Sequence, residues 1–302
     1  MPVSDLNEHI IRTLLYYEIF DHPLSEKELF YLLPKNSLTR TTFRVSLEEM
    51  LEQGTLARTV GFFHLPSKES NGTKRIERQQ LAKKRILIAR FITHIIKRFP
   101  FVRGVFISGD LSKGVATPSS DIDYVIITEP RRVWICRTIL MLFKKVFLLN
   151  SKKYFCLNYY VDANNLSLDE RNYYTATEIA HLKPVYNLPL FLKYLNANNW
   201  ILEYFPNYRN SPFHTNGVNN RQSAFQKLFE MVFQGSWADR FDNFLMETMK
   251  RTWKKRYPEY SDETRENIFK CTVHESRAYG GNFAGKVLSM YDTKLSEHHL
   301  NT

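Results

Sequence analysis

The sequence predicts an α+β protein, and three observations lead to that class. Apolar residues recur at helical spacing through the first 65 residues, and the chain reads as mostly helical again after Leu168. Between these regions, short apolar runs bounded by turn residues predict strands at 101–108, 121–128 and 154–161. The 302 residues, 43% of them apolar, are enough for two or three packed parts. We expect an N-terminal module at 1–68, a mixed-sheet core with a leading helix at 69–206, and a helical C-terminal region at 207–302.

The N-terminal module is expected to hold three helices and a small hairpin. Ser25-Glu26-Lys27-Glu28 has the pattern of a capping box that opens the second helix, and the third runs from about Thr41 to Gln53. Two short runs, 56–59 and 62–65, flank the turn at Val60-Gly61. This order resembles a winged helix, whose third helix binds the DNA major groove. Residues 1–70, however, hold ten Asp/Glu against seven Lys/Arg. Because DNA binding depends on neutralising phosphates, we favour an interaction or scaffold role over DNA binding.

A basic helix is predicted to lead into the core. Residues 67–75 have the composition of a linker, and a helix follows from about 76 to 99. Residues 71–103 hold ten Lys/Arg and one Asp/Glu, so most of the net charge of +11 lies here. The cations of residues 74–98 are either a solvated helix face or an electropositive approach for an anionic partner such as RNA.

Composition disfavours secreted and membrane proteins. The first twenty residues contain Asp5 and Glu8 and lack the pattern of a signal peptide. The most apolar helix, 133–149, is interrupted by three Lys or Arg residues and is too charged to span a bilayer. Three widely separated cysteines, with no CxxC pair, indicate free thiols in a reducing compartment. We therefore expect a cytoplasmic protein with no membrane partner.

The C-terminal region offers weaker signals. Residues 207–220, rich in Asn and Pro, predict a connector to the last helices. His274-Glu275-Ser276-Arg277 has the residue types of a catalytic cluster, but without a partner of known geometry we interpret it as the polar edge of a helix.

Two stretches of the core carry the chemical signal: SGDLSKG at 108–114 and DIDYVII at 121–127. Strand alternation puts Asp121 and Asp123 on one face, with Ile122 and Tyr124 on the other. Two like charges so close repel each other. A divalent cation would remove this repulsion, so the pair predicts a metal site beside a glycine-containing turn.

This arrangement resembles the nucleotidyltransferase superfamily, whose fold is that of DNA polymerase β. The family motif is an apolar run, Gly-Ser, a spacer and Asp-hydrophobic-Asp; here 105–107 supply the run, Gly109 the glycine, and Asp121 and Asp123 the carboxylates. The resemblance implies that these two aspartates bind Mg²⁺ or Mn²⁺, which bridges the triphosphate of a nucleotide. It also implies that the turn lines the phosphate site, through Ser108, Gly109, Asp110 and Lys113.

The resemblance covers about two-thirds of the chain. It rests further on YYEIFDHPL (16–24), Gly61-Phe62-Phe63, the basic helix, CLNY (156–159) and YTATE (174–178). The chain is thereby similar to a broad set of bacterial proteins in which a winged-helix-like module precedes a nucleotidyltransferase-like domain. That similarity names neither the base nor the acceptor.

Two positions depart from the family pattern. Asp110 stands where the family usually has Ser; its carboxylate is either an extra metal ligand or a group that repels phosphate. Active members carry a third carboxylate on the next core strand, where the best-centred residue here is Asn158, which cannot act as a base. By alternation Asp162 shares the face of Asn158 and is the replacement we expect.

The predicted activity is metal-dependent transfer of a nucleotidyl group from a nucleoside triphosphate to an acceptor. The catalytic residues would be Asp121, Asp123 and Asp162, with the metal on the first two. The rival is a catalytically silent module that holds a nucleotide, RNA or a protein in the same cleft, and Asp110 and Asn158 favour it.

Overall fold

The N-terminal part surrounds a small three-stranded sheet with helices. The computed structural model describes residues 3–34, 39–66, 71–210, 223–278 and 282–300. The first elements are α1 (Val3–Glu18), β1 (Leu24–Ser25), α2 (Glu26–Tyr31), α3 (Arg40–Glu52), β2 (Ala57–Thr59) and β3 (Phe62–His64). The strands are antiparallel in the order β1-β3-β2. The Ser25 hydroxyl accepts from the backbone N–H of Glu28, whose carboxylate accepts from the backbone N–H of Ser25. The predicted helices, capping box and hairpin are confirmed.

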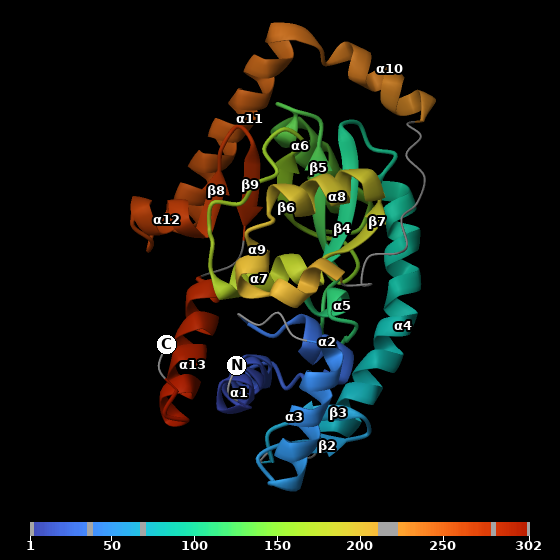
Figure 1. Cartoon of the computed structure of the whole chain (residues 1–302). Helices are drawn as coiled ribbons and strands as arrows, with labels where there is room; N and C mark the ends of the chain where they lie inside the picture. The colour runs from blue at the N-terminus through green and yellow to red at the C-terminus, as the bar shows by residue number, and fades with distance from the viewer. Residues whose placement is uncertain (1–2, 35–38, 67–70, 211–222, 279–281, 301–302) are drawn as a thin grey trace.

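A long helix, α4 (Asn71–Ile96), joins this part to the main sheet and runs along one side of the molecule (Figure 1). Residues 71–75, predicted as linker, instead form its first turns, while 67–70 lie outside the described residues. The physical reason is tertiary packing. Arg75 is only 2% exposed, and its guanidinium donates to the Glu28 carboxylate at 2.7 Å and to the Pro23 carbonyl at 3.0 Å. These contacts fix the backbone of a segment whose composition alone indicates a loop.

The main sheet has six strands in the order β7-β4-β5-β6-β9-β8. Its strands are β4 (Val102–Ser108), β5 (Asp123–Thr128), β6 (Cys156–Asp162), β7 (Lys183–Tyr186), β8 (Phe269–Cys271) and β9 (Glu275–Ala278). β5 and β6 are parallel and all other neighbours are antiparallel, so the sheet is mixed. This confirms the α+β class and the three predicted strands.

The expectation of a mostly helical chain after Leu168 is wrong in three places, because β7, β8 and β9 all follow that residue. Each has only three or four residues, too few to show the period of two that identifies a strand. β7 also contains Pro184, which a strand tolerates at the sheet edge where β7 lies. β9 consists of residues 275–278, so the polar cluster at 274–277 lies on and beside a strand, not on a helix edge.

Helices cover both faces of the sheet. One face packs on α4, α6 (Val133–Phe147) and α11 (Gly235–Arg256), in a core that includes Val105, Tyr124 and Trp134. The other packs on α7 (Tyr173–His181), α8 (Leu188–Ala197) and α9 (Ile201–Tyr204), in a core with Phe106, Val125 and Phe191. This second core is continuous with that of the N-terminal part. The remaining elements are α5 (Gly109–Ser112), the 3₁₀ helix η2 (Pro206–Asn210), α10 (Ala224–Val232), α12 (Asp262–Ile268) and α13 (Phe283–Glu297).

The last helix returns to the first (Figure 1). α13 lies beside α1, where Lys294 Nζ is 2.7 Å from a carboxylate oxygen of Glu18 and the Tyr291 hydroxyl donates to the Arg12 carbonyl at 3.2 Å. The predicted connector is split, since 206–210 form η2 and 211–222 lie outside the described residues. Within the described ranges, none of the helices combines the length and apolar character needed to cross a membrane.

Candidate functional site

Two adjoining cavities lie where β4 ends and β5 begins. The smaller, of about 400 Å³, is lined by the turn after β4, the start of β5, and residues of α4, α7 and the segment after α1. The larger, of about 600 Å³, extends from there towards β9 and the start of α13. The two share six lining residues: Ser108, Asn158, Tyr159, Tyr174, Glu178 and Phe283. They therefore form one cleft with two compartments.

The turn after β4 lies directly against the carboxylate of Asp123. Gly109 has a φ of +63°, which L side chains rarely adopt, and a Cβ at this position would lie 2.6 Å from Asp123 Oδ2. Ser108 and Asp123 are partners in the β4–β5 ladder. Only glycine allows this close approach, so the turn and the carboxylate form one unit, as the sequence motif predicts.

Carboxylates gather in the smaller compartment. Asp110, Asp121, Asp123 and Glu178 all line it. Burial raises the pKa of Asp123 to about 6, and the charges of Asp121, Glu178 and Asp110 add to this rise, whereas a hydrogen bond with Cys156 opposes it. The ionised site is therefore strained electrostatically, and a cation placed there would relieve the strain.

We predict that Asp123→Asn stabilises the metal-free protein at pH 8. Between about pH 4 and 6 the folded protein keeps a proton on Asp123 that the unfolded chain has released, so stability falls as pH rises through this window. At pH 8 the full cost of ionisation, about 2–3 kcal/mol, is present and the amide avoids it.

Urea unfolding with a chelator at pH 4 and pH 8 measures this effect. Asp242, whose pKa burial raises to about 7, is present in both proteins, so the difference between them isolates Asp123. A variant that is no more stable than the wild type at pH 8, or one whose advantage is equal at both pH values, would contradict the assignment.

The other turn residues are held by specific contacts. Asp110 Oδ2 accepts from the Ser120 hydroxyl at 2.7 Å, which ties the turn to the loop just before Asp121. Lys113, predicted to line the phosphate site, does line the smaller compartment, where its Nζ lies 2.7 Å from Glu178 Oε1. The structure thus brings together Ser108, Gly109, Asp110, Lys113, Asp121 and Asp123.

Asp162 does not join them, and this prediction was wrong. In the parallel pair β5–β6, Cys156 is the partner of Asp123, whereas Asp162 is the partner of Thr128. Five residues along a strand separate these positions by roughly 17 Å. Asp162 therefore lies at the opposite end of the sheet from the aspartate pair.

A register shift also moves Asp162 to the other face. Asp123 and Val125 are two residues apart, but their partners Cys156 and Tyr159 are three apart. After this irregularity Tyr159 packs in the same core as Val125, and Tyr160 packs in the opposite core. Simple alternation from Asn158 therefore fails. Asn158 itself lines both compartments.

Asp162 instead anchors a loop. It is fully buried and accepts from the backbone N–H of Asn164 at 2.8 Å and from Asn165 Nδ2 at 3.0 Å, and its Oδ2 lies 2.7 Å from His274 Nδ1. Burial disfavours the charge of Asp162, but these hydrogen bonds outweigh it and hold the pKa below the usual range. The residue is a structural carboxylate, and His274 is its partner.

Part of the basic helix faces inwards. Arg78 lines the smaller compartment and donates to the Asp21 carbonyl at 3.0 Å, and Arg85 donates to the carbonyls of Pro118 and Ser120. With Arg75 these side chains hold the N-terminal part and the loop before Asp121 in place. Lys83, Lys84, Arg90 and Arg98 are exposed, and RNA binding through them stays a prediction.

Sequence reasoning gave no role to several residues of the cleft. Glu178 comes from α7, Arg78 from α4, and Phe20 and His22 from the segment between α1 and β1. The available signal was the resemblance itself. Five of its segments, 16–24, 108–114, 121–127, 156–159 and 174–178, contribute to this one cleft, whereas Gly61-Phe62-Phe63 does not.

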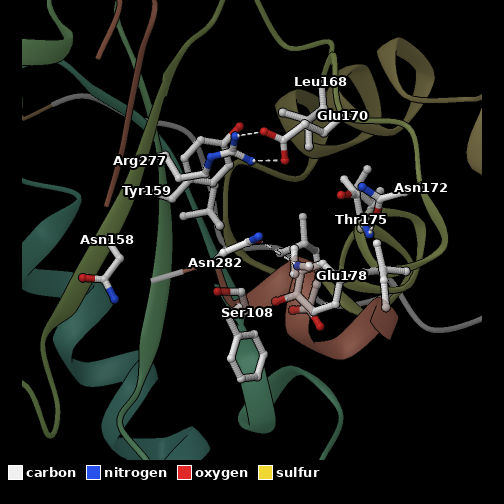
Figure 2. Close-up of a pocket in the computed structure, with 18 of the residues that line it drawn as sticks. Ser108, Asn158, Tyr159, Leu168, Glu170, Asn172, Thr175, Glu178, Arg277 and Asn282 are labelled. Atoms are coloured by element: carbon white, nitrogen blue, oxygen red, sulfur yellow. Dashed lines mark hydrogen bonds and ion pairs between the residues drawn. The ribbon is translucent and has the colours of Figure 1, made fainter. Parts of the chain in front are cut away.

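Aliphatic and aromatic side chains form most of the lining of the larger compartment, with several neutral polar groups among them. Figure 2 shows the Arg277–Glu170 ion pair on its wall, where Arg277 Nη1 is 3.1 Å from Glu170 Oε2, together with Asn158, Asn172, Thr175 and Asn282. The opposite charges of Arg277 and Glu170 therefore cancel each other on this wall. The smaller compartment is acidic by contrast.

Comparisons of the chain with protein-family models, with curated proteins and with solved structures found no match. Among the described residues, no group of three or more His, Cys, Asp or Glu side chains has an arrangement that by itself could hold a metal ion. Magnesium sites often have one or two protein carboxylates and take their remaining ligands from substrate phosphates and water.

Proposed function

We propose that this chain is a nucleotidyltransferase with a DNA polymerase β-like core, and that its cleft binds a nucleoside triphosphate with Mg²⁺ or Mn²⁺. The observation that carries the proposal is the contact between the Gly109 turn and the Asp123 carboxylate. It joins a backbone turn able to approach phosphates closely to an acidic pair at the start of the neighbouring strand. The convergence of the motif segments on this cleft supports the same assignment.

The residues present fit a divalent cation. Asp121 and Asp123 line the same compartment, and carboxylate oxygens are the ligands that Mg²⁺ and Mn²⁺ prefer. The raised pKa of Asp123, caused by burial and neighbouring carboxylates, indicates a site that a cation would stabilise. When bound, the metal would neutralise the triphosphate and orient it for attack.

The acceptor occupies the larger compartment in this proposal. A hydroxyl oxygen of the acceptor bonds to the α-phosphorus, the bond from that phosphorus to the α,β-bridging oxygen breaks, and pyrophosphate leaves. Glu178 lies on the wall shared by the two compartments, so its carboxylate is placed to take the hydroxyl proton. Lys113, paired with Glu178 at 2.7 Å, positions that carboxylate.

The second candidate is a silent module that binds the nucleotide without transferring it. Asn158 favours it, since the strand position of the usual third carboxylate holds an amide and Asp162 lies elsewhere. In this case Glu178 and Lys113 form only a structural ion pair.

We predict that the wild type transfers label from at least one α-³²P nucleoside triphosphate. The four triphosphates are incubated with Mn²⁺ and separate pools of protein, RNA and small hydroxylated acceptors. The larger compartment, of about 600 Å³ and mostly apolar with a few polar groups, has the size and lining of a small-molecule site, so we expect transfer to the small-molecule pool. Nucleotide binding without transfer to any pool would favour the silent module, and failure to bind any nucleotide would contradict both candidates.

A further inference from the structure

Helix α10 carries a row of exposed apolar side chains. Polar groups anchor it to the molecule: Gln226 is 1% exposed and donates to the carbonyls of Lys97 and Phe99, at 2.8 and 3.0 Å. Phe229 and Phe233 are partly buried, and Phe233 packs against the core. Glu230 accepts from the backbone N–H of Phe101 at 2.6 Å and from Arg103 at 2.7 Å. Its outward side chains are Leu228, Met231 and Val232, which are 60–63% exposed. Surface helices normally bury their apolar stripe, so this orientation indicates a surface that another molecule covers.

A row of aromatic rings continues this surface onto α11. The ring centroids of Phe229 and Phe233 are 5.1 Å apart, and those of Phe233 and Trp237 are 5.2 Å apart. The row goes on to Phe241 at 6.3 Å from Trp237 and to Phe244 at a further 6.4 Å. Trp237 and Phe244 are 44% and 62% exposed. We call Leu228, Phe229, Met231, Val232, Phe233, Trp237, Phe241 and Phe244 the aromatic ridge.

The spacing along the aromatic ridge matches a helical partner. On α11 the positions 237, 241 and 244 are separated by four and then three residues, and on α10 the positions 231 and 232 lie three and four residues after 228. This is the spacing of the seam through which two helices pack together.

The charges around the ridge are basic. Lys227 and Arg240 are exposed beside it. The nearby acids are paired with bases: Glu230 with Arg103 at 2.7 Å, Asp239 with Arg131 at 3.1 Å and Arg132 at 2.6 Å, and Glu247 with Lys250 at 3.2 Å. A partner that approaches the ridge therefore meets unbalanced positive charge.

We propose that the aromatic ridge docks an amphipathic helix of another protein, whose apolar stripe is flanked by Asp and Glu. The spacing of the apolar residues favours a helical partner, and the exposed Lys227 and Arg240 beside the ridge favour a partner with acidic residues. A second copy of this chain fits less well, because a two-fold interface through the ridge sets the same basic rim against itself. This inference does not depend on the proposed activity, since the ridge contributes no residue to the cleft.

Two synthetic helical peptides of three heptads test the proposal. Both carry Leu at positions a and d; one has Glu and the other Lys at e and g. The reporter is Trp237, because Trp134, Trp200 and Trp253 are all at most 6% exposed. We expect the Glu peptide to shift tryptophan emission to the blue and the Lys peptide to have no effect. Phe244→Glu should weaken binding about tenfold or more. Val45→Glu, an equally exposed apolar position on α3 at the far end of the molecule, should leave it unchanged (Figure 1).

Four outcomes would overturn the proposal. The first is that neither peptide binds, and the second is that the Lys peptide binds as well as the Glu peptide. In the third, phosphatidylglycerol vesicles shift the emission while the Glu peptide does not, which would assign the ridge to a membrane surface. In the fourth, the wild type dimerises in sedimentation equilibrium and Phe244→Glu does not, which would assign it to a second copy.

Discussion

Replacing Asp121 and Asp123 together by Asn is expected to abolish the stabilisation that a nucleoside triphosphate with Mg²⁺ or Mn²⁺ gives the wild type. A ligand at a hundred times its dissociation constant adds about 2.7 kcal/mol to the free energy of unfolding, about 4 °C in melting temperature for a chain of this size. Both aspartates line the smaller compartment beside the Gly109 turn. Without their charges the metal has no protein carboxylate pair to hold it.

Thermal unfolding with and without the ligands measures the effect. The matched control is Asp292→Asn, which removes an exposed carboxylate of α13 and should keep the full shift. A double variant that still responds like the wild type would show that the metal and nucleotide bind elsewhere. Because Asn has nearly the shape of Asp and relieves the cost of the buried Asp123 charge, we expect the variant to fold.

Glu178→Gln is expected to lower the rate of nucleotidyl transfer by about 10²-fold, the scale of losing a positioned general base. Nucleotide binding should stay within a few-fold of the wild type, since the aspartate pair and the turn are intact. A merely structural role in pairing with Lys113 would lower stability and leave the transfer rate of the folded protein unaltered.

Asp162→Asn is the matched control for Glu178. It neutralises a carboxylate that lies at the other end of β6, so the transfer rate should not change although stability falls. If Asp162→Asn slows transfer and Glu178→Gln does not, the assignment of the base is reversed.

Local patterns predicted most of the parts that build the cleft. The capping box at Ser25, the strand predicted at 121–128 and the glycine at 109 each follow from short-range rules about caps, alternation and positive φ, although the strand begins at Asp123, two residues later than predicted. The long helix was also evident, although its first turns were assigned to a linker. Each of these features depends on residues that are close together in the sequence, so it can be predicted without knowledge of the fold.

The failures all depend on contacts between distant segments. The prediction for Asp162 fails because one extra residue in β6 before Tyr159 reverses which side chains face which side of the sheet. No residue type in that stretch indicates the irregularity. Glu178 belongs to the segment YTATE, but the sequence alone gives it no role, because only the packing of α7 against the sheet brings it to the cleft. β8 and β9 are too short to show the period of two that identifies a strand. They are recognised as strands only because β9 pairs with β6 and β8 pairs with β9.

Anomalous scattering from Mn²⁺ locates the metal directly. Crystals of the wild type are soaked with Mn²⁺ and a nucleoside triphosphate whose α,β-bridging oxygen is replaced by a methylene group. We expect a manganese peak between the carboxylates of Asp121 and Asp123, with the triphosphate against the turn at Gly109. A peak at another site, or a triphosphate bound away from that turn, would contradict this expectation.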